Sequence, residues 1–340
     1  MQISRRAFLL TAAAVACSRR ARSSPLQKAA EYLWAQQAED GGFHSTTYGL
    51  LRSGQSLTPF VLDALMAIPE TFASRRMALD RAFAFIKKNT NANGTLGQMD
   101  ETADYPNYAT ALAVSVLMKA GRHLDVGPMV AHLRSQQFVE ANGWKRDDLP
   151  YGAWGMGGPI HRPPETGHVD LSMTRYVLEA LRAAGVPPSD PAITRALVYL
   201  ERSQNKDGGF YFSTVNPEIN KAGESNGVYA SYGTATADGL LALRAAGIPD
   251  QDARVANAID WLRSHHQPDR APGFDGTARQ SWGSGLRFYY ASVISKTALG
   301  LPVALPPQAS DGSFRNENKM VKEDDPLIAT TFAVHVLASR

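Results

Sequence analysis

The sequence has a single cysteine, Cys17, which lies within the first 24 of its 340 residues. The rest of the chain therefore has no disulfide, no thiolate nucleophile and no cysteine ligand for zinc. Basic residues are not in excess there either, because the first 24 residues hold five arginines and no acids, which leaves 30 basic against 32 acidic residues. This balance excludes the strongly basic surface that nucleic-acid binding requires, so no nucleic-acid partner is expected.

Residues 1–24 predict a twin-arginine export signal. Ser4-Arg5-Arg6-Ala7-Phe8-Leu9 precedes a mild apolar run that ends at Ala16, the pattern of a bacterial secretory address. That run, about ten residues, is too short to span a membrane. Ala14-Val15-Ala16-Cys17 resembles a lipoprotein cleavage site, so a lipid anchor on Cys17 and release without a lipid stay open. We expect residues 25–340 to be exported with the help of the twin-arginine translocase, to the periplasm, the outside of the cell or a lipid-anchored place in the envelope.

A helical pattern recurs six times along the chain, and its clearest copy is residues 170–185. In each copy a Thr or Ser anchor is followed seven residues later by Leu, nearly two helical turns away and so on the same stripe. The six pairs are Thr58/Leu65, Thr110/Leu117, Thr174/Leu181, Thr236/Leu243, Ser292/Leu299 and Thr330/Leu337.

Five amphipathic segments of a second type alternate with these copies, and glycine turns punctuate them. The segments are 26–37, 76–88, 126–137, 191–204 and 251–266, and the turns are 40–43, 93–94, 142–144, 207–210, 272–274 and 311–314, the last without a clear helix before it. Such spacing indicates helical-pair repeats. The last copy, 325–339, is as apolar as the middle ones, which favours a ring that closes on itself over an open solenoid.

Two turns carry the same string, Gln-x-x-Asp-Gly-Gly-Phe, at 37–43 and 204–210. This string resembles the repeat of terpenoid cyclases and protein prenyltransferase β-subunits. The resemblance implies an all-α fold, an α/α toroid of six inner helices surrounded by outer helices, over roughly residues 26–340. It also implies a central ligand cavity. The repeat is specific for the fold and not for the chemistry.

The inner copies should keep one face for packing and turn another toward the lumen of the ring. We expect lumen side chains two residues before each anchor and one, two and five residues after it. For an apolar, isoprenoid-like ligand, the predicted binding residues are Phe60, Tyr108, Ser172, Tyr176, Tyr232, Tyr289, Tyr290 and Phe332, with Arg175 or Arg287 pairing an anionic head.

The resemblance also shows which family chemistry is missing. Prenyltransferases bind zinc through Asp-x-Cys and a later His, whereas the matching positions here are Asp170-x-Ser172 and Ile328, so neither a metal nor another cofactor is expected. Class II terpene cyclases protonate an alkene with Asp-x-Asp-Asp. The nearest string is 322–325, Lys-Glu-Asp-Asp, in which Asp324 would take the place of the proton donor.

Three function hypotheses follow. The first is a toroid that binds or transforms an apolar ligand, with Asp170, Asp238 or Asp324 as acid or base if it is a catalyst. The second is a non-catalytic scaffold that binds a peptide, glycan or protein of the cell envelope. The third is a glycan-cleaving toroid with paired carboxylates, from Asp63, Glu179 and Asp238. Asp170 also fits a helix N-cap. The glycine-rich stretch 145–158 fits either a lid or a plain loop.

Overall fold

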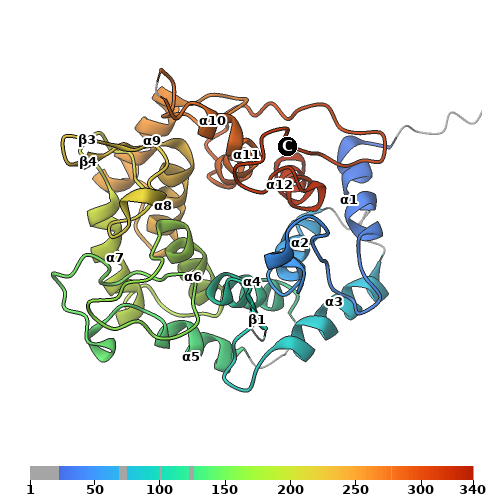
Figure 1. Cartoon of the computed structure of the whole chain (residues 1–340), viewed down its shortest axis with the longest axis horizontal. Coiled ribbons are helices and arrows are strands. Elements are labelled where there is room, and N and C mark those ends of the chain that lie inside the picture. Colours follow the sequence, from blue (N-terminus) through green and yellow to red (C-terminus); the bar gives the residue numbers. More distant parts are fainter. Residues whose placement is uncertain (1–22, 69–74, 100–101, 122–125, 277, 340) are drawn as a thin grey trace, which may run out of the picture.

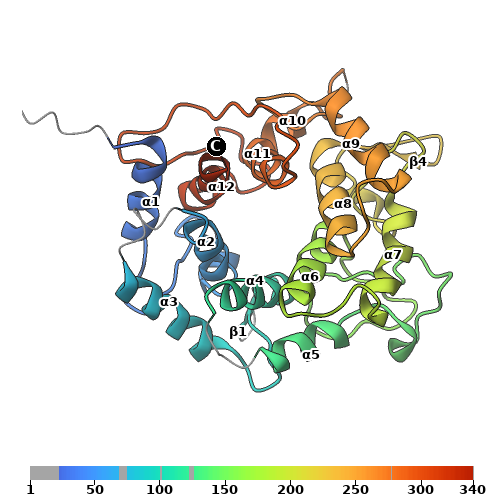
Figure 2. The ribbon, with the colours of Figure 1, turned by 180° about the vertical axis from the view of Figure 1, so that it is seen from behind.

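The computed structural model describes residues 23–68, 75–99, 102–121, 126–276 and 278–339, and these form two concentric rings of helices (Figures 1 and 2). The inner ring contains α2 (Leu57–Leu65), α4 (Pro106–Lys119), α6 (Leu171–Ala183), α8 (Gly233–Ala245), α11 (Arg287–Lys296) and α12 (Pro326–Ala338). The outer helices are α1 (Pro25–Ala35), α3 (Arg76–Asn89), α5 (Gly127–Ser135), α7 (Pro191–Ser203) and α9 (Ala253–His265). A short helix, α10 (Ser281–Gly285), precedes α11.

The inner ring closes on itself. Each inner helix contacts the next in chain order, and α12 contacts both α2 and the first outer helix, α1. Within the described residues, strands are limited to two small antiparallel pairs, β1 (Gln98–Met99) with β2 (Thr102–Ala103) and β3 (Glu224–Ser225) with β4 (Val228–Tyr229). Short 3-10 helices lie at Gly49–Leu51, Glu140–Asn142 and Pro217–Ile219. The predicted all-α toroid is confirmed.

Polar side chains start many of these helices. The Ser24 hydroxyl accepts a hydrogen bond from the backbone N–H of Gln27 and caps α1, and Asp170, Asp190, Asp252 and Asp325 cap α6, α7, α9 and α12 in the same way. The predicted export signal, residues 1–24, lies outside the described residues up to residue 22.

The Thr anchors have a specific task, because they bind the turn that precedes each inner helix. The Thr58 hydroxyl accepts a hydrogen bond from the backbone N–H of Phe43 at 2.9 Å. The same bond joins Leu96 to Thr110, Trp154 to Thr174, Phe210 to Thr236 and Phe314 to Thr330. Each bond satisfies a buried donor and fixes the apolar residue after the turn against the inner helix.

These bonds correct the predicted third turn. The residue bound to Thr174 is Trp154, so the repeat turn is 151–154 and not 142–144, which is part of an insertion before it. Trp154 is fully buried, and its ring N–H donates to the Leu133 carbonyl at 2.6 Å. The stretch around Trp154 is therefore packed into the core, which favours the interpretation of 145–158 as a plain loop.

A repeated glutamine links each turn to the next outer helix. The side-chain amide of Gln37 donates to the carbonyls of Gly41 and Ala78, and Gln137 and Gln204 make the equivalent pairs of bonds. Gln308, missed in the sequence, donates to Gly312 and, across the whole chain, to Pro25 at the start of α1. The sixth turn therefore closes the ring without an outer helix of its own.

We expect Gln308→Ala to lower the free energy of unfolding by roughly 1–2 kcal/mol, because two backbone carbonyls lose their donor. Urea unfolding of the variant measures this loss, and the exposed Gln280 gives a matched control, Gln280→Ala, with little effect. An unchanged midpoint for Gln308→Ala would mean that its two bonds do not hold the ring closed.

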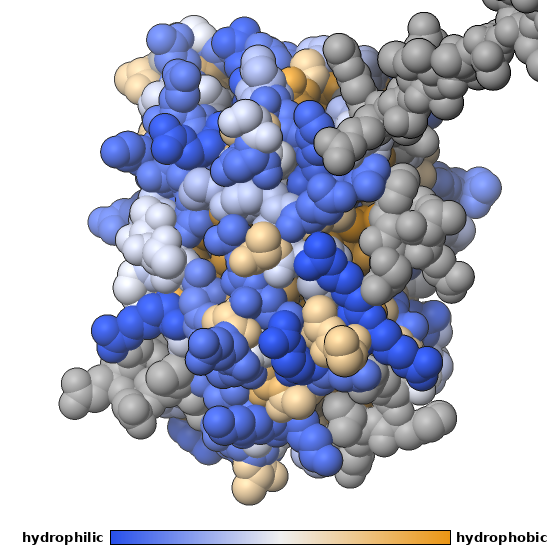
Figure 3. Space-filling model, turned by 90° about the vertical axis from the view of Figure 1, so that its right-hand side faces the viewer, coloured by the Kyte–Doolittle hydropathy of each residue, from blue (hydrophilic) through white to orange (hydrophobic). Residues whose placement is uncertain are grey.

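The side of the ring seen in Figure 3 is largely hydrophilic, with apolar side chains scattered singly among polar ones. Such isolated apolar residues are ordinary for a protein surface. Among the described residues, no helix has both the length and the apolar character needed to cross a membrane.

Candidate functional site

One layer of side chains runs around the lumen, with a contribution from every inner helix. Ring centroids lie 6.5 Å apart for Phe60 and Tyr108, 4.7 Å for Tyr108 and Tyr176, 4.9 Å for Phe60 and Phe332, and 5.5 Å for Phe332 and Tyr289. We call these five rings the aromatic layer. Tyr108, Tyr289 and Phe332 remain partly exposed, so the layer borders open space in the lumen.

A cluster of charged side chains completes the layer around the lumen between Tyr176 and Tyr289. The guanidinium of Arg175, fully buried, lies 3.7 Å from the centre of the Tyr176 ring, and its Nε is 2.9 Å from Asp238 Oδ1. Its Nη1 donates to both oxygens of Glu179 at 3.0 and 2.9 Å. Asp238 Oδ2 accepts from the hydroxyls of Ser172 and Tyr289 at 2.5 and 2.7 Å.

The charges of Arg175 and Asp238 are stabilised to different degrees. Burial opposes the charge of Arg175, but the attraction of Glu179 and other neighbours keeps its pKa well above the usual value. Burial raises the pKa of Asp238, although Arg175 and two hydroxyl donors act in the opposite direction. Every oxygen of Asp238 thus faces a cation or a donor, which makes this carboxyl a structural link across α6, α8 and α11.

Three predicted ligand residues lie elsewhere. Tyr290 is buried away from the lumen, and its hydroxyl is 2.8 Å from the ring of His266, after α9. Tyr232 caps the start of α8 and packs against Phe274 in the core. Arg287 donates to the Ala304 carbonyl and lines a separate polar hollow of about 830 Å³. The prediction that these three side chains line the lumen is therefore wrong.

A shifted register in α11 explains the error at Tyr290. Tyr289 reaches Asp238 and Lys296 reaches Asp63, so both side chains face the lumen. They occupy the expected offsets, two before and five after the anchor, if the anchor position is Ala291 and not Ser292. Leu299, which suggested the wrong register, lies beyond the end of α11 at Lys296.

The residues five positions after the anchors gather at the end of the lumen where the inner helices finish. Asp63, Ser115, Glu179, Lys296 and His335 line one hollow of about 430 Å³ there, which we call the lysine basin. Asp63 is its centre, with Lys119 Nζ at 2.6 Å, Lys296 Nζ at 3.1 Å and His335 Nε2 at 3.5 Å. Cations are favoured here because the carbonyl ends of the helices carry partial negative charge.

Charges in the lysine basin shift two pKa values. Burial alone would raise the pKa of Asp63, but Lys296, His335 and Lys119 hold it far below its usual value. Burial and the positive charge of Lys296 lower the pKa of His335 to about 3. Asp63 is therefore ionised and His335 neutral at pH 7.

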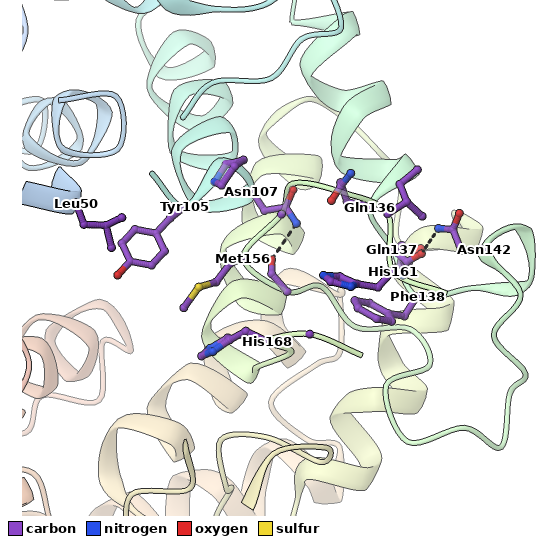
Figure 4. Close-up of a pocket in the computed structure, with 15 residues that line it drawn as sticks. Leu50, Tyr105, Asn107, Gln136, Gln137, Phe138, Asn142, Met156, His161 and His168 are labelled. Carbon is purple, nitrogen blue, oxygen red and sulfur yellow. Dashed lines mark hydrogen bonds between the residues drawn. The ribbon is translucent and has the colours of Figure 1, made fainter. Parts of the chain in front are cut away.

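A second pocket opens at the other end of the lumen, where the inner helices begin. We call it the rim pocket; it holds about 450 Å³. Figure 4 shows it between the start of α4 and the 154–168 segment, with Leu50, Tyr105 and Met156 at one end and Phe138 and His161 at the other. Leu50, Pro106, Phe138, Met156 and Ile160 make its walls mainly apolar.

Two polar groups in the rim pocket are held firmly. His168 Nε2 lies 2.8 Å from Asp170 Oδ2, and the buried Asp170 uses its other oxygen to cap α6. Asn107, only 1% exposed, donates through Nδ2 to the Gly155 carbonyl at 2.9 Å, while its Oδ1 has no partner among the described residues. Gly157, with φ of 94°, lies over that oxygen, and a Cβ there would be 2.8 Å from it.

The third carboxylate candidate, Asp324, lies at this same end of the lumen. It accepts a hydrogen bond from the Tyr48 hydroxyl. The neighbouring Lys322 has Nζ 5.8 Å from the Tyr48 ring and 3.5 Å from the Tyr105 hydroxyl. Glu323 is buried and accepts from the backbone N–H groups of Phe288 and Tyr289, so this segment caps α11 and does not present a cluster of acids to the lumen.

Asp170 offers a test that separates capping from its bond to His168. Asp170→Ala removes both and should lower the free energy of unfolding by about 0.5–2 kcal/mol, whereas Asp170→Asn keeps an oxygen for the cap and should cost less. Urea unfolding of both variants measures the difference, with Asp252→Ala, at the cap of α9, as a control for cap loss. If Asp170→Asn and Asp170→Ala lost the same free energy of unfolding, a helix cap made by Asp170 Oδ1 would be contradicted.

Some of the residues that shape these sites escaped the sequence analysis. Lys119 and Lys296 lay outside the expected offsets, the second only because of the register in α11. Asn107 gave no signal at all, since one buried amide in a helix start has no sequence pattern. Within the described ranges, no group of three or more His, Cys, Asp or Glu side chains is placed to hold a metal ion.

Comparisons with known proteins match this geometry. A family model for the prenyltransferase alpha-alpha toroid domain matches residues 4–143, and one for the squalene-hopene cyclase C-terminal domain matches residues 166–271. The squalene–hopene cyclase of Bradyrhizobium diazoefficiens is 35% identical over 159 residues, which cover 45% of this chain. The matched stretch spans only 20% of that relative. The resemblance to this repeat family, expected from the sequence, is confirmed.

Solved structures with the same fold differ in chemistry. A type II terpene cyclase variant from Scytonema, in complex with geranylgeranyl dihydroxybenzoate, aligns over 93% of this chain and 96% of its own with a TM-score of 0.54 and 13% identity. Candida albicans protein geranylgeranyltransferase-I, complexed with GGPP, has a TM-score of 0.57 and 14% identity, covering 92% and 90%. An α-1,6-mannanase of Salegentibacter reaches 0.51 with 12% identity over 92% and 98%. At these identities the likeness shows the fold alone.

Proposed function

Since this chain is an α/α toroid built from repeats of the terpenoid cyclase and prenyltransferase type, we propose that it binds an apolar, isoprenoid-like molecule. The ligand enters where the inner helices begin, lies in the rim pocket and extends toward the aromatic layer. The observation that carries this proposal is the rim pocket itself: about 450 Å³, mainly apolar walls and a few fixed polar groups, the usual make-up of a small-molecule site.

The opposite end of the lumen suits such a ligand poorly. Lys119, Lys296, Asp63 and Glu179 line the lysine basin, and an apolar chain there would displace water from charged groups without replacing their partners. The aromatic layer lies between the two ends and offers ring faces to an apolar chain. The ligand is therefore assigned to the end with the rim pocket.

The three candidate carboxylates are already engaged by partners within the protein, and this favours ligand binding over acid catalysis. Asp238 is enclosed by Arg175, Ser172 and Tyr289, and Asp170 caps α6 and holds His168. Asp324 is hydrogen-bonded to Tyr48. The glycan-cleaving alternative also lacks support, because Arg175 pairs with both Glu179 and Asp238, and two lysines lie beside Asp63.

A charge on the pocket wall tests this assignment. Ile160, 43% exposed, lines the rim pocket, so Ile160→Asp should fold normally and reduce uptake of farnesol about tenfold or more, measured by native mass spectrometry. Leu149, 55% exposed and outside the described pocket lining, gives the matched control Leu149→Asp with unchanged uptake. Failure of the unmodified protein to take up any isoprenoid would leave the envelope scaffold as the better explanation.

We further propose that the chain acts outside the cytoplasm, exported by the twin-arginine route, on the strength of Arg5, Arg6 and the apolar run after them. Replacing both arginines by lysine should keep the precursor in the cytoplasm. Cell fractionation measures the result, and normal export of the lysine variant would refute this route. Mass spectrometry of the exported protein distinguishes a lipidated Cys17 from release without a lipid.

A further inference from the structure

The rim pocket has no positive charge on its described walls. Its described lining residues include no lysine and no arginine. The two arginines expected to pair an anionic head are engaged elsewhere, Arg175 with Glu179 and Asp238 and Arg287 with the Ala304 carbonyl. A diphosphate or carboxylate end buried against His168 and Asn107 would lose its hydration and find no cation among the lining residues, since Lys322 reaches only the Tyr105 end of the pocket. The part of the pocket beside His168 and Asn107 therefore favours a neutral polar end.

Two polar groups on one wall of the pocket offer hydrogen-bond acceptors, and the first is His168. Asp170 Oδ2 can only accept when ionised, so His168 Nε2 carries the proton of their 2.8 Å bond. In the neutral ring the other nitrogen, Nδ1, then keeps a lone pair. His168 lines the rim pocket with 28% of its side chain exposed, whereas Asp170 is buried behind it. Asp170 thus holds His168 in the tautomer that accepts at Nδ1.

Asn107 adds a second acceptor on the same wall. Its Nδ2 donates to Gly155, which fixes the orientation of the amide and leaves Oδ1 as the free atom. An unpaired buried acceptor is costly, and a donor that reaches it removes that cost. Gly157, the residue that covers Oδ1, has a backbone conformation with positive φ. A small shift of this glycine would open Oδ1 to a group in the pocket.

From these observations we infer that the rim pocket recognises a hydroxyl group, so the ligand is an apolar alcohol or phenol. The hydroxyl donates its proton to His168 Nδ1, and Asn107 Oδ1 is the second acceptor within the pocket wall. Asp170 is a positioning residue, because it acts through the tautomer of His168. This inference rests on the proposed isoprenoid binding and specifies the polar end of that ligand.

Three probes test it on the intact protein, by native mass spectrometry and calorimetric titration. Farnesol carries a hydroxyl donor, farnesyl methyl ether keeps the oxygen without the donor, and farnesyl diphosphate carries an anionic end. We expect farnesol to bind about tenfold more tightly than the methyl ether, because the hydroxyl gives His168 Nδ1 the donor that the ether lacks. The diphosphate should bind more weakly than farnesol.

Asp170→Asn gives a readout that a purely structural role would not change. The Asn amide can donate to His168 Nε2, which moves the ring proton to Nδ1 and turns the acceptor into a donor. The preference for farnesol over its methyl ether should then shrink or invert, while binding of squalene, which has no polar end, stays the same. Asp252→Asn, at the cap of α9, should keep the preference of the unmodified protein.

The outcomes separate this inference from the proposed function. If farnesol, its ether and squalene bind equally well, in both the unmodified protein and Asp170→Asn, the isoprenoid site stands and hydroxyl recognition is refuted. Tighter binding of the diphosphate than of farnesol would also overturn it. If none of the probes binds, the proposed function fails first.

Discussion

Arg175→Met is expected to lower the free energy of unfolding by about 3–5 kcal/mol, the largest loss that we expect from a single side chain. Arg175 is fully buried, and it alone lies between the carboxylates of Glu179 and Asp238. Without it, the buried Asp238 would lose its ion-pair partner and would either stay charged or take up a proton, and either change costs stability. Methionine fills much of the same volume, so the loss reports on charge and not on a cavity. Urea unfolding at pH 7 measures it.

A second substitution shows whether the loss comes from the stranded charge. When both members of a buried ion pair become apolar, much of the lost stability usually returns. Arg175→Met with Asp238→Leu should therefore be more stable than Arg175→Met alone. Arg195→Met is the matched control, because Arg195 forms a largely exposed pair with Glu140 and should cost less than 1 kcal/mol. A loss no larger than this control would mean that the buried pair does not hold the inner ring together.

The fold could be predicted from the sequence because its signals are local and repeated. A Thr anchor, a Leu seven residues later and a glycine turn before each helix recur, and the anchor bond between Thr58 and Phe43 shows why this residue type is needed. The predicted position of a turn was wrong where a second candidate turn lay nearby. Gly143 and Gly152 both precede a tryptophan by one or two residues, and only the bond from Trp154 to Thr174 identifies the repeat turn.

The candidate site was predicted less completely, because it depends on which residues from distant helices meet. Phe60, Tyr108, Tyr176 and Phe332 were expected in the lumen from their offsets, and their rings do contact one another. A one-residue error of register in α11 placed Tyr290 in the lumen beside Tyr289, which was expected there, and hid Lys296. A side chain such as Asn107 acquires its role only from the Gly155 carbonyl and the Gly157 backbone beside it.

The second large effect concerns His335 and pH. Its pKa is about 3 in the folded protein, because burial and Lys296 disfavour the charged ring, against an ordinary value near 6.5 in the unfolded chain. Between these two values the unfolded state binds a proton that the folded state does not, so stability falls as the pH falls. From pH 7 to pH 4 the loss from this residue is roughly 3 kcal/mol, at about 1.4 kcal/mol per pH unit below 6.5.

Other groups titrate in the same range, so the test compares two proteins. Burial raises the pKa of Glu323 to about 7, which makes the folded state more stable as the pH falls toward 4.5 and opposes the effect of His335. Asp63, whose pKa is lowered, loses its contribution only below its usual value near 3.8. The effect of Glu323 is common to the unmodified protein and to His335→Gln, so it cancels in the difference between them, and the effect of Asp63 falls below the pH range that is compared.

His335→Gln is therefore expected to gain stability relative to the unmodified protein as the pH is lowered, by roughly 3 kcal/mol between pH 7 and pH 4. Glutamine cannot be protonated in this range, and its amide N–H group can donate to Asp63, which lies 3.5 Å from His335 Nε2. Urea unfolding at several pH values measures the difference. His265→Gln, at an exposed position at the end of α9, should run parallel to the unmodified protein. A constant difference for His335→Gln across this range would mean that His335 is solvated or charged in the folded lumen, and the lysine basin would then be open to water.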